Sequence, residues 1–177
     1  MNCLWNIKKV LDKIMMIFRG FKVEMIYSPK GFVKILGKVY LDNPNIKFGK
    51  NVVLYPNVHI FGPGNVILED NVSLGDGTII CAARNIKIGR NTMTGAHCYI
   101  IDCNHGMHLG VPMRKQTMSI KETIIEEDVW LGCGVKILAG ARVKTGAVIG
   151  AGTVITGFVN NETICYGSRE YILKERH

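Results

Sequence analysis

Bulky apolar residues recur at intervals of six along most of this chain. The series runs from Ile35 to Ile155, and Thr94 is its one member that is not large and apolar. Two positions before each member lies a small or β-branched residue, such as Val52 or Ala147. Such pairs suit two residues on the same face of a short strand. The pattern therefore predicts a succession of short strands joined by tight turns, and its near-unbroken register argues against an ordinary β-sandwich.

Interruptions of the six-residue period fall after every third hexad, except after Ile137, where the period runs on. Most add one or two residues, but the interruption between Ile100 and Ile125 adds nineteen. Three hexads therefore form one coil of a triangular, all-β parallel β-helix, with every insertion at the same corner. We expect a loop over about 102–122 to project from that corner. Unstructured loops of this length in a compact domain are usually functional.

The first thirty residues follow a different period. We expect residues 1–30 to form a short amphipathic N-terminal helical segment, and 31–177 to form the β-helix domain with a C-terminal tail. The helix either caps the open first coil, which would otherwise expose a strand edge, or rests on a membrane surface. The apolar stripe consists of Leu4, Ile7, Leu11, Ile14, Met15 and Phe18.

Composition and charge narrow the class of protein. The 177 residues are 47% hydrophobic and 20% charged, which is typical of a folded domain. The net charge is +8, and residues 1–30 carry about half of it. Because no nucleic-acid-binding motif accompanies these basic residues, an anionic cofactor or a membrane surface is the better interpretation.

The location of the protein is predicted from its apolar segments and its cysteines. The longest apolar stretch, from Ile14 to Phe18, is too short to span a bilayer, and no signal peptide is evident. The six cysteines form no CxxC pair. We therefore expect a cytoplasmic protein with reduced thiols.

A metal site is weighed because Cys103, His105 and His108 lie close together in the sequence. Zinc sites in proteins take three or four ligands at suitable spacing. The two histidines are separated by only two residues, and no third histidine lies in a matching hexad. We therefore expect no metal.

The hexads, above all "IEEDVWLGCGVKILAGARVKTGAVIGAGTVIT", resemble those of the hexapeptide-repeat acyltransferases over roughly residues 31–175. The long loop, "DCNHGMHLGVPMRKQ", and the later "VWLG" are similar to motifs of the maltose, galactoside and polysaccharide O-acetyltransferases. The resemblance implies a left-handed coil, although general rules favour right-handed crossovers. It also implies a homotrimer that transfers an acetyl group from acetyl-CoA to a saccharide.

His105 occupies the catalytic position of the family. The resemblance implies that it is the general base that activates the acceptor hydroxyl, a task suited to the pKa of histidine. Asp102 either orients the imidazole or caps a turn. His108 is interpreted as a loop residue on the acceptor side.

Acetyl-CoA binding is assigned by the same resemblance to the coils that follow the loop. Trp130 would line the pantetheine channel or simply pack against the loop, and Cys133, Ala151 and Thr156 match small positions along that channel. The tail departs from the family pattern, because "TGFVNN" replaces its lysine, aspartate and prolines. Lys174 is a candidate partner for the nucleotide phosphates, with surface contact as the alternative.

The acceptor side is less informative. Asp76, Arg84, His108 and Arg114 are candidate acceptor contacts, and a larger acceptor such as a polysaccharide repeat unit is expected. We therefore predict an O-acetyltransferase of surface polysaccharide biosynthesis. It would contact the inner membrane peripherally if the N-terminal helix rests there. The alternatives are an N-acetyltransferase acting on an amino sugar or small amine, and a non-enzymatic β-helix subunit.

Overall fold

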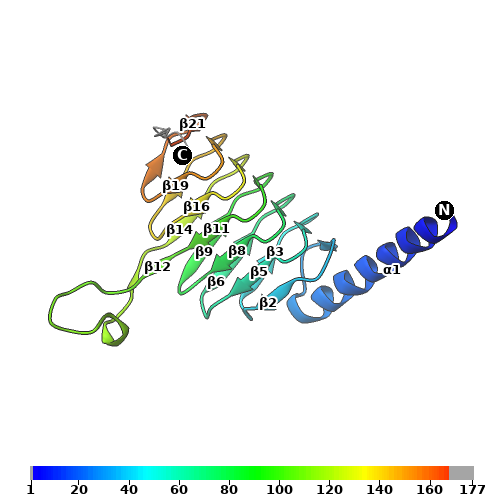
Figure 1. The fold of residues 1–177 in the computed structure, drawn as a ribbon, viewed down its shortest axis with the longest axis horizontal. Coiled ribbons are helices and arrows are strands. Elements are labelled where there is room, and N and C mark those ends of the chain that lie inside the picture. Colours follow the sequence, from blue (N-terminus) through cyan, green and yellow to red (C-terminus); the bar gives the residue numbers. More distant parts are fainter. Residues whose placement is uncertain (1, 168–177) are drawn as a thin grey trace, which may run out of the picture.

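The computed structural model describes residues 2–167, and it begins with helix α1 (Asn2–Tyr27). The rest of the described chain winds through three parallel sheets that form the faces of a prism (Figure 1). The first sheet contains β1 (Lys34–Ile35), β4 (Val53–Leu54), β7 (Ser73–Leu74), β10 (Met93–Thr94), β15 (Trp130–Leu131), β18 (Val148–Ile149) and β21 (Ile164–Cys165).

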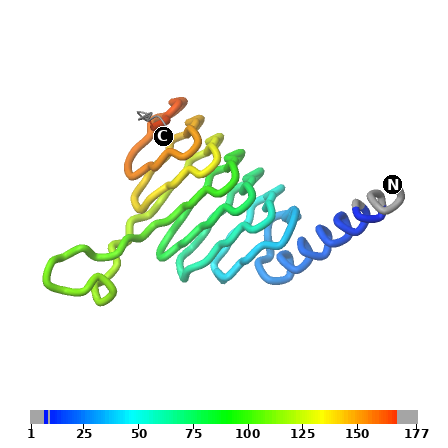
Figure 2. The backbone as a smooth tube through the Cα atoms, in the orientation of Figure 1, coloured from blue at the N-terminus to red at the C-terminus, as the bar shows by residue number. Residues whose placement is uncertain are grey.

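The other two sheets complete each coil. The second contains β2 (Tyr40–Asp42), β5 (His59–Phe61), β8 (Ile79–Cys81), β11 (Tyr99–Ile101), β16 (Lys136–Ile137) and β19 (Val154–Ile155). The third contains β3 (Ile46–Phe48), β6 (Asn65–Leu68), β9 (Asn85–Ile88), β14 (Thr123–Ile125), β17 (Arg142–Val143) and β20 (Phe158–Val159). The smooth tube in Figure 2 shows these coils stacked one on another. The predicted parallel β-helix with triangular coils is therefore confirmed.

The core lies inside the prism and consists of the residues that define the hexad pattern. In register, Ile60 pairs with Ile80, and Ile80 with Ile100; all three are fully buried. Thr94 is the polar member of the series, and its hydroxyl accepts a hydrogen bond from the backbone N–H of Gly75 at 2.9 Å. The polar exception is thus satisfied inside the core.

Two edges of the prism matter for function. The loop edge, between the second and third sheets, carries the insertions at 43–45, 62–64, 82–84 and 102–122. The turn edge, between the first and second sheets, carries the tight turns at 56–57, 76–77, 96–97, 133–134 and 151–152. The prediction that every insertion lies at one corner is confirmed, and that corner is the loop edge.

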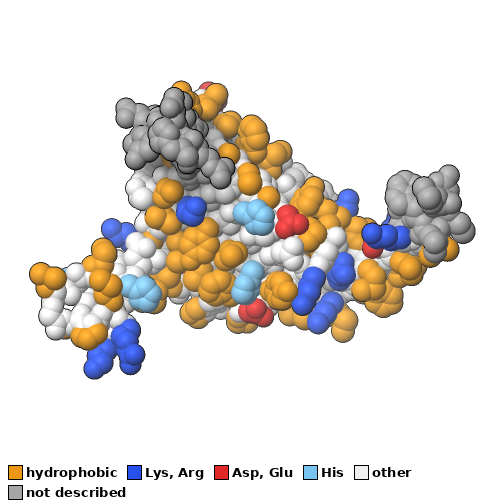
Figure 3. Space-filling view, viewed as in Figure 1, with side chains coloured by type: hydrophobic (Ala, Val, Ile, Leu, Met, Phe, Trp, Pro, Cys, Tyr) orange, Lys and Arg blue, Asp and Glu red, His pale blue; other side chains and the backbone are white. Residues whose placement is uncertain are grey.

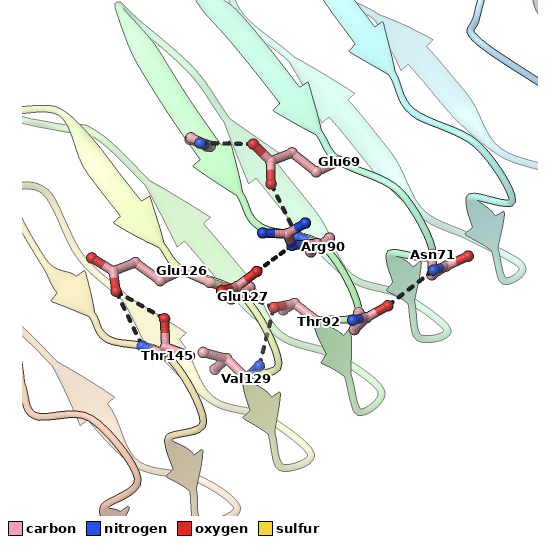
Figure 4. A network of polar contacts seen from close by, with 10 residues as sticks. Glu69, Asn71, Arg90, Thr92, Glu126, Glu127, Val129 and Thr145 are labelled. Carbon is pink, nitrogen blue, oxygen red and sulfur yellow. Dashed lines mark hydrogen bonds and ion pairs between the residues drawn. The ribbon is translucent and has the colours of Figure 1, made fainter.

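The long insertion does not interrupt the stack of coils. Strand β9 before the loop pairs directly with β14 after it. The Thr92 hydroxyl donates to the carbonyl of Glu126 at 2.8 Å and accepts from the N–H of Val129 at 3.1 Å. Arg90 and Glu127 form an ion pair across the same junction (Figure 4). The loop is therefore attached to a continuous scaffold.

Helix α1 meets the first coil through its C-terminal turns. Val23 is buried. The Tyr27 hydroxyl donates a hydrogen bond to the carbonyl of Asn43 at 3.0 Å. The Tyr27 ring packs edge-on against the Phe48 ring, with 5.6 Å between the ring centroids. These contacts agree with the capping interpretation. The preceding turns extend away from the prism (Figure 1).

Helix α1 exposes a broad apolar arc, within which Lys22 is the one charged residue near the first coil. At 100° per residue, its exposed apolar side chains cover an arc of about 180°, opposite the face that carries Gly20, Val23 and Tyr27. In the described part of the chain, no helix is sufficiently long and apolar to cross a membrane. The arc consists of Ile7, Val10, Leu11, Ile14, Met15, Ile17, Phe18, Phe21, Met25 and Ile26.

Candidate functional site

The long loop begins and ends in a short antiparallel ribbon. Strands β12 (Cys103–Asn104) and β13 (Ser119–Ile120) pair at its foot, and the N–H of Lys121 donates to the carbonyl of Asp102 at 2.8 Å. His105 is the first residue beyond β12, so its backbone is held at the foot of the loop. Its side chain is exposed and has no hydrogen-bond partner among residues 2–167. The imidazole is therefore open to a substrate.

Asp102 is fully buried beneath this ribbon and faces the neighbouring coil. One carboxylate oxygen accepts the N–H of Ala83 at 2.7 Å, and the other accepts those of Arg84 and Asn85 at 2.8 and 2.7 Å. No contact with His105 is recorded among the described residues. This arrangement favours the turn-cap interpretation of Asp102 over orientation of the imidazole.

Two thiols lie near the foot of the loop. Burial, with the neighbouring Cys103 thiol, raises the pKa of Cys81 to about 11, and burial also raises the pKa of Cys103. Because the thiolate is the nucleophilic form, both side chains are unreactive at neutral pH. A covalent thioester intermediate on either cysteine is therefore disfavoured.

Gln116 holds the outer part of the loop. Its amide oxygen accepts the N–H of His108 at 2.8 Å, and its amide nitrogen donates to the carbonyls of His108 and Val111 at 2.9 and 2.7 Å. A Cβ at Gly106 would lie 2.7 Å from the Gln116 side chain. Gln116 is the last residue of the motif "DCNHGMHLGVPMRKQ", but the motif alone does not indicate its role. Among the described residues, the outer part of the loop contains two other regular features, the turn at Leu109–Gly110 and the short 3₁₀ helix η1 (Met113–Lys115).

The candidate acetyl-CoA residues gather at the first sheet and the turn edge. Trp130 points outward from β15, 52% exposed, in register with Met93 and Val148. Cys133 and Ala151 follow on successive coils of the turn edge, and both are exposed. The structure therefore brings these three candidates onto one continuous surface.

Glycine allows the coils to stack closely behind this surface. A Cβ at Gly95 would lie 2.7 Å from the backbone nitrogen of Cys133, and one at Gly132 would lie 2.6 Å from that of Ala151. Backbone atoms cannot move aside as a flexible side chain can, so these positions exclude larger residues. The coils therefore stack closely beside Trp130, and Cys133 and Ala151 are the small exposed residues of this part of the turn edge.

The remaining candidates are divided between the two edges. Asp76 lies at the turn edge, where it accepts a hydrogen bond from the Asn57 amide at 3.2 Å. Arg84 and Thr156 are exposed at the loop edge, and His108 and Arg114 are exposed on the loop itself. Lys174 lies outside the described residues.

No single edge therefore contains a complete site. The candidate base, His105, is at the loop edge, whereas the candidate acetyl-CoA residues Trp130, Cys133 and Ala151 lie at the turn edge and on the sheet before it. Each side of the prism is one hexad long, which corresponds to roughly 15–20 Å of extended chain. Within one chain, the second sheet separates the two groups.

A metal centre finds no support in the described part of the chain. In residues 2–167, no group of three or more His, Cys, Asp and Glu side chains lies close enough together to hold a metal ion. The histidine and cysteine of the loop foot are part of no such group.

Known proteins with similar sequences and structures point to acyl transfer. Residues 122–157 match the family model "Bacterial transferase hexapeptide (six repeats)". The chain is 29% identical over 141 residues to WbbJ of Escherichia coli (strain K12), named as an O-acetyl transferase of lipopolysaccharide biosynthesis; the match covers 74% of this chain and 72% of WbbJ. It is 27% identical to the galactoside O-acetyltransferase of Lactococcus lactis subsp. lactis (strain IL1403), over 93% and 76% of the two chains.

A solved structure shares the fold. AntD, an N-acyltransferase from Bacillus cereus in complex with dTDP-4-amino-4,6-dideoxyglucose and coenzyme A, superposes with a TM-score of 0.69 and 16% identity over 87% of each chain. This chain therefore carries the bacterial transferase hexapeptide repeat, and its predicted resemblance to the hexapeptide-repeat O-acetyltransferases is confirmed.

Proposed function

We propose that this protein is an acetyl-CoA-dependent O-acetyltransferase that modifies a saccharide hydroxyl in surface polysaccharide biosynthesis. The observation that carries the proposal is the exposed His105 at the foot of the loop, in a chain similar to two proteins named as O-acetyltransferases. A purely structural β-helix subunit would need neither this loop nor the exposed Trp130.

The proposed reaction is direct transfer. His105 takes the proton of the acceptor hydroxyl, whose oxygen attacks the carbonyl carbon of the acetyl thioester. The tetrahedral intermediate collapses, the carbon–sulfur bond breaks, and the imidazolium returns the proton to the coenzyme A thiolate. A backbone N–H of an adjacent coil would stabilise the oxyanion. Asp102 takes no part in these proton transfers, because its carboxylate is occupied by three amides.

An acceptor screen tests the activity. Purified protein with radiolabelled acetyl-CoA should label an oligosaccharide repeat unit through an alkali-labile ester. Labelling of an amino sugar through an alkali-stable amide would instead support the N-acetyltransferase alternative. If neither class of acceptor is labelled while acetyl-CoA still binds, the proposed acceptor is wrong.

We infer that the active unit is a homotrimer. The candidate base and the candidate acetyl-CoA surface lie on different edges of one prism, so the loop edge of one copy must face the turn edge of the next to complete a site. The loop also exposes apolar side chains, including Leu109 at 98% and Met107 at 78%, that a neighbouring copy would cover.

Light scattering after size-exclusion chromatography should give about 59 kDa, three times the chain mass of 19.7 kDa. Mixing inactive His105→Ala chains with inactive Ala151→Trp chains should then restore activity, because one interface in the mixed trimer keeps both intact groups. A stable monomer that retains full activity would rule out the shared site.

We further infer a cytoplasmic protein with peripheral contact with the inner membrane. Cys81, Cys98, Cys103, Cys133 and Cys165 are free thiols, as expected in a reducing compartment. The apolar arc of α1 has Lys8 at one margin and Lys13 beyond the other, and Lys22 lies within it near the first coil. A broad apolar arc with basic residues is typical of helices that lie in a membrane interface.

A further inference from the structure

A hollow with a basic lining lies where α1 joins the first coil. Arg19 and Lys22 of the helix, and Lys38 and Tyr40 of the coil, border it together with apolar side chains such as Ile26. Figure 3 shows Lys and Arg side chains gathered where the helix meets the body of the molecule. The basic hollow is therefore lined by cationic side chains from two elements that are distant in the sequence.

The cations of the basic hollow are not neutralised by acidic neighbours. In the described part of the chain, Arg19, Lys22 and Lys38 form no ion pair. The Lys38 ammonium lies over the Tyr40 ring, 4.8 Å from its centre, a contact that does not neutralise its charge. The one carboxylate that lines the hollow, Asp42, is bound to the His59 imidazole at 2.9 Å. The hollow thus has an excess of positive charge.

A second hollow on α1 is almost wholly apolar. Phe18, Phe21 and Met25 line it, with exposed fractions of 70%, 58% and 83%, and Lys22 borders it. Lys22 also lines the basic hollow, so the two are contiguous. A cationic recess beside an apolar surface matches a ligand that has an anionic head and a hydrocarbon tail.

We propose that the basic hollow binds the anionic phosphate headgroup of a membrane phospholipid, while its acyl chains lie against Phe18, Phe21 and Met25. This inference rests on the proposed membrane contact of α1 and deepens it by naming the lipid class and a residue of the β-helix, Lys38, that recognises it. Arg19 supplies a planar fork of donors that suits phosphate oxygens, and Lys22 and Lys38 supply point charges.

A membrane fits the exposed face of α1 better than a second copy of the chain does. The seam of a two-stranded coiled coil is a narrow stripe, whereas the apolar arc here covers about half of the helix circumference. Basic residues at the margins of such an arc are typical of helices that bind anionic membranes. The positive hollow would also repel the same hollow of another copy.

Lipid binding at this position would place the catalytic loop near the membrane. Lys38 precedes β2, and His105 follows β11, three coils further along the second sheet. At about 4.8 Å per coil, the two levels differ by about 14 Å along the prism axis. An acceptor saccharide attached to a lipid would therefore lie within a few sugar units of His105.

Vesicle flotation with the full-length protein tests the proposal without relying on activity. Wild-type protein should float with vesicles of phosphatidylcholine plus phosphatidylglycerol and only weakly with phosphatidylcholine alone. Lys38→Gln should weaken binding to the anionic vesicles about fivefold, as expected for one basic residue at a membrane surface. Lys34→Gln, which removes the same charge from the first coil outside the hollow, should leave binding nearly unchanged.

Two further measurements separate the alternatives. Phe18→Ser should abolish flotation, and inorganic phosphate should compete poorly, because it lacks the acyl chains.

Equal losses of vesicle binding for Lys38→Gln and Lys34→Gln would overturn the site in favour of diffuse electrostatic attraction. Equal binding to both kinds of vesicle would overturn the headgroup assignment, and a Phe18→Ser protein that loses oligomers rather than flotation would assign the arc to a second copy. Acetyl transfer to a soluble acceptor should survive Lys38→Gln, so failure here and failure of the proposed enzyme are distinguishable.

Discussion

His105→Ala should lower kcat for acetyl transfer by ~10²–10⁴-fold, the usual contribution of a positioned general base. The affinity for acetyl-CoA should change little, because the imidazole acts on the acceptor hydroxyl and the candidate acetyl-CoA surface lies at the other edge of the prism. The melting temperature should also remain near that of the wild type, since the His105 side chain is exposed and has no partner in residues 2–167. Steady-state kinetics, calorimetric titration with acetyl-CoA and thermal unfolding measure the three quantities separately.

His108→Ala is the matched control within the same loop. The backbone of His108 is held by Gln116 through both its N–H and its carbonyl, and these bonds survive removal of the imidazole. Its effect should appear mainly in the KM for the acceptor. A His105→Ala enzyme with near wild-type turnover would remove the central argument for the mechanism. Collapse of both variants together with loss of a bound metal would instead support a metal site.

The fold could be predicted from the sequence because its determinants are local and repeated. Each hexad supplies an inward residue such as Ile60 or Ile80, and stacking one coil on another needs only that the period be kept. Counting the residues between successive hexads located the insertions, and their common position identified the loop edge correctly. The hand of the coil came instead from the resemblance, because the hydrophobic period is the same for either hand.

The site was predicted less completely because its geometry depends on contacts between coils. The sequence places Asp102 three residues before His105, which suggests a pair, yet the carboxylate faces the amides of the coil below. A side-chain period cannot show which neighbouring backbone amides lack partners. In the same way, Gln116 could be recognised as part of a motif but not as the residue that closes the outer loop.

Helix α1 shows a similar limit. Its apolar stripe was evident from residues such as Leu11 and Phe18, but a stripe does not reveal whether it faces the core or solvent. Only the structure shows that the contact with the first coil is made through Val23 and Tyr27, on the opposite face. The membrane interpretation gains its physical basis from that opposition.

Asp102→Ala should be among the most destabilising single changes in the protein. The side chain is fully buried, and its removal would leave the backbone N–H groups of Ala83, Arg84 and Asn85 without their acceptor. A buried donor that loses a charged acceptor costs about 1–3 kcal/mol, and these three bonds are partly buried, so a total loss of about 3 kcal/mol is expected. For a chain of this size, that corresponds to a drop in melting temperature on the order of 10 °C.

Asp70→Ala provides the control for removing a carboxylate that accepts from backbone. Its oxygen accepts the N–H of Lys50 at 2.7 Å at an exposed corner, where water can replace it, so the loss of stability should be below about 1 kcal/mol.

Asp102→Asn distinguishes the two roles considered for Asp102. If the carboxylate oriented His105, the asparagine variant would melt near the wild type while kcat fell. The asparagine side chain would instead turn its own N–H donors toward the backbone N–H groups of the neighbouring coil. We therefore expect the melting temperature to fall. Below the unfolding transition, kcat per folded molecule should be largely kept.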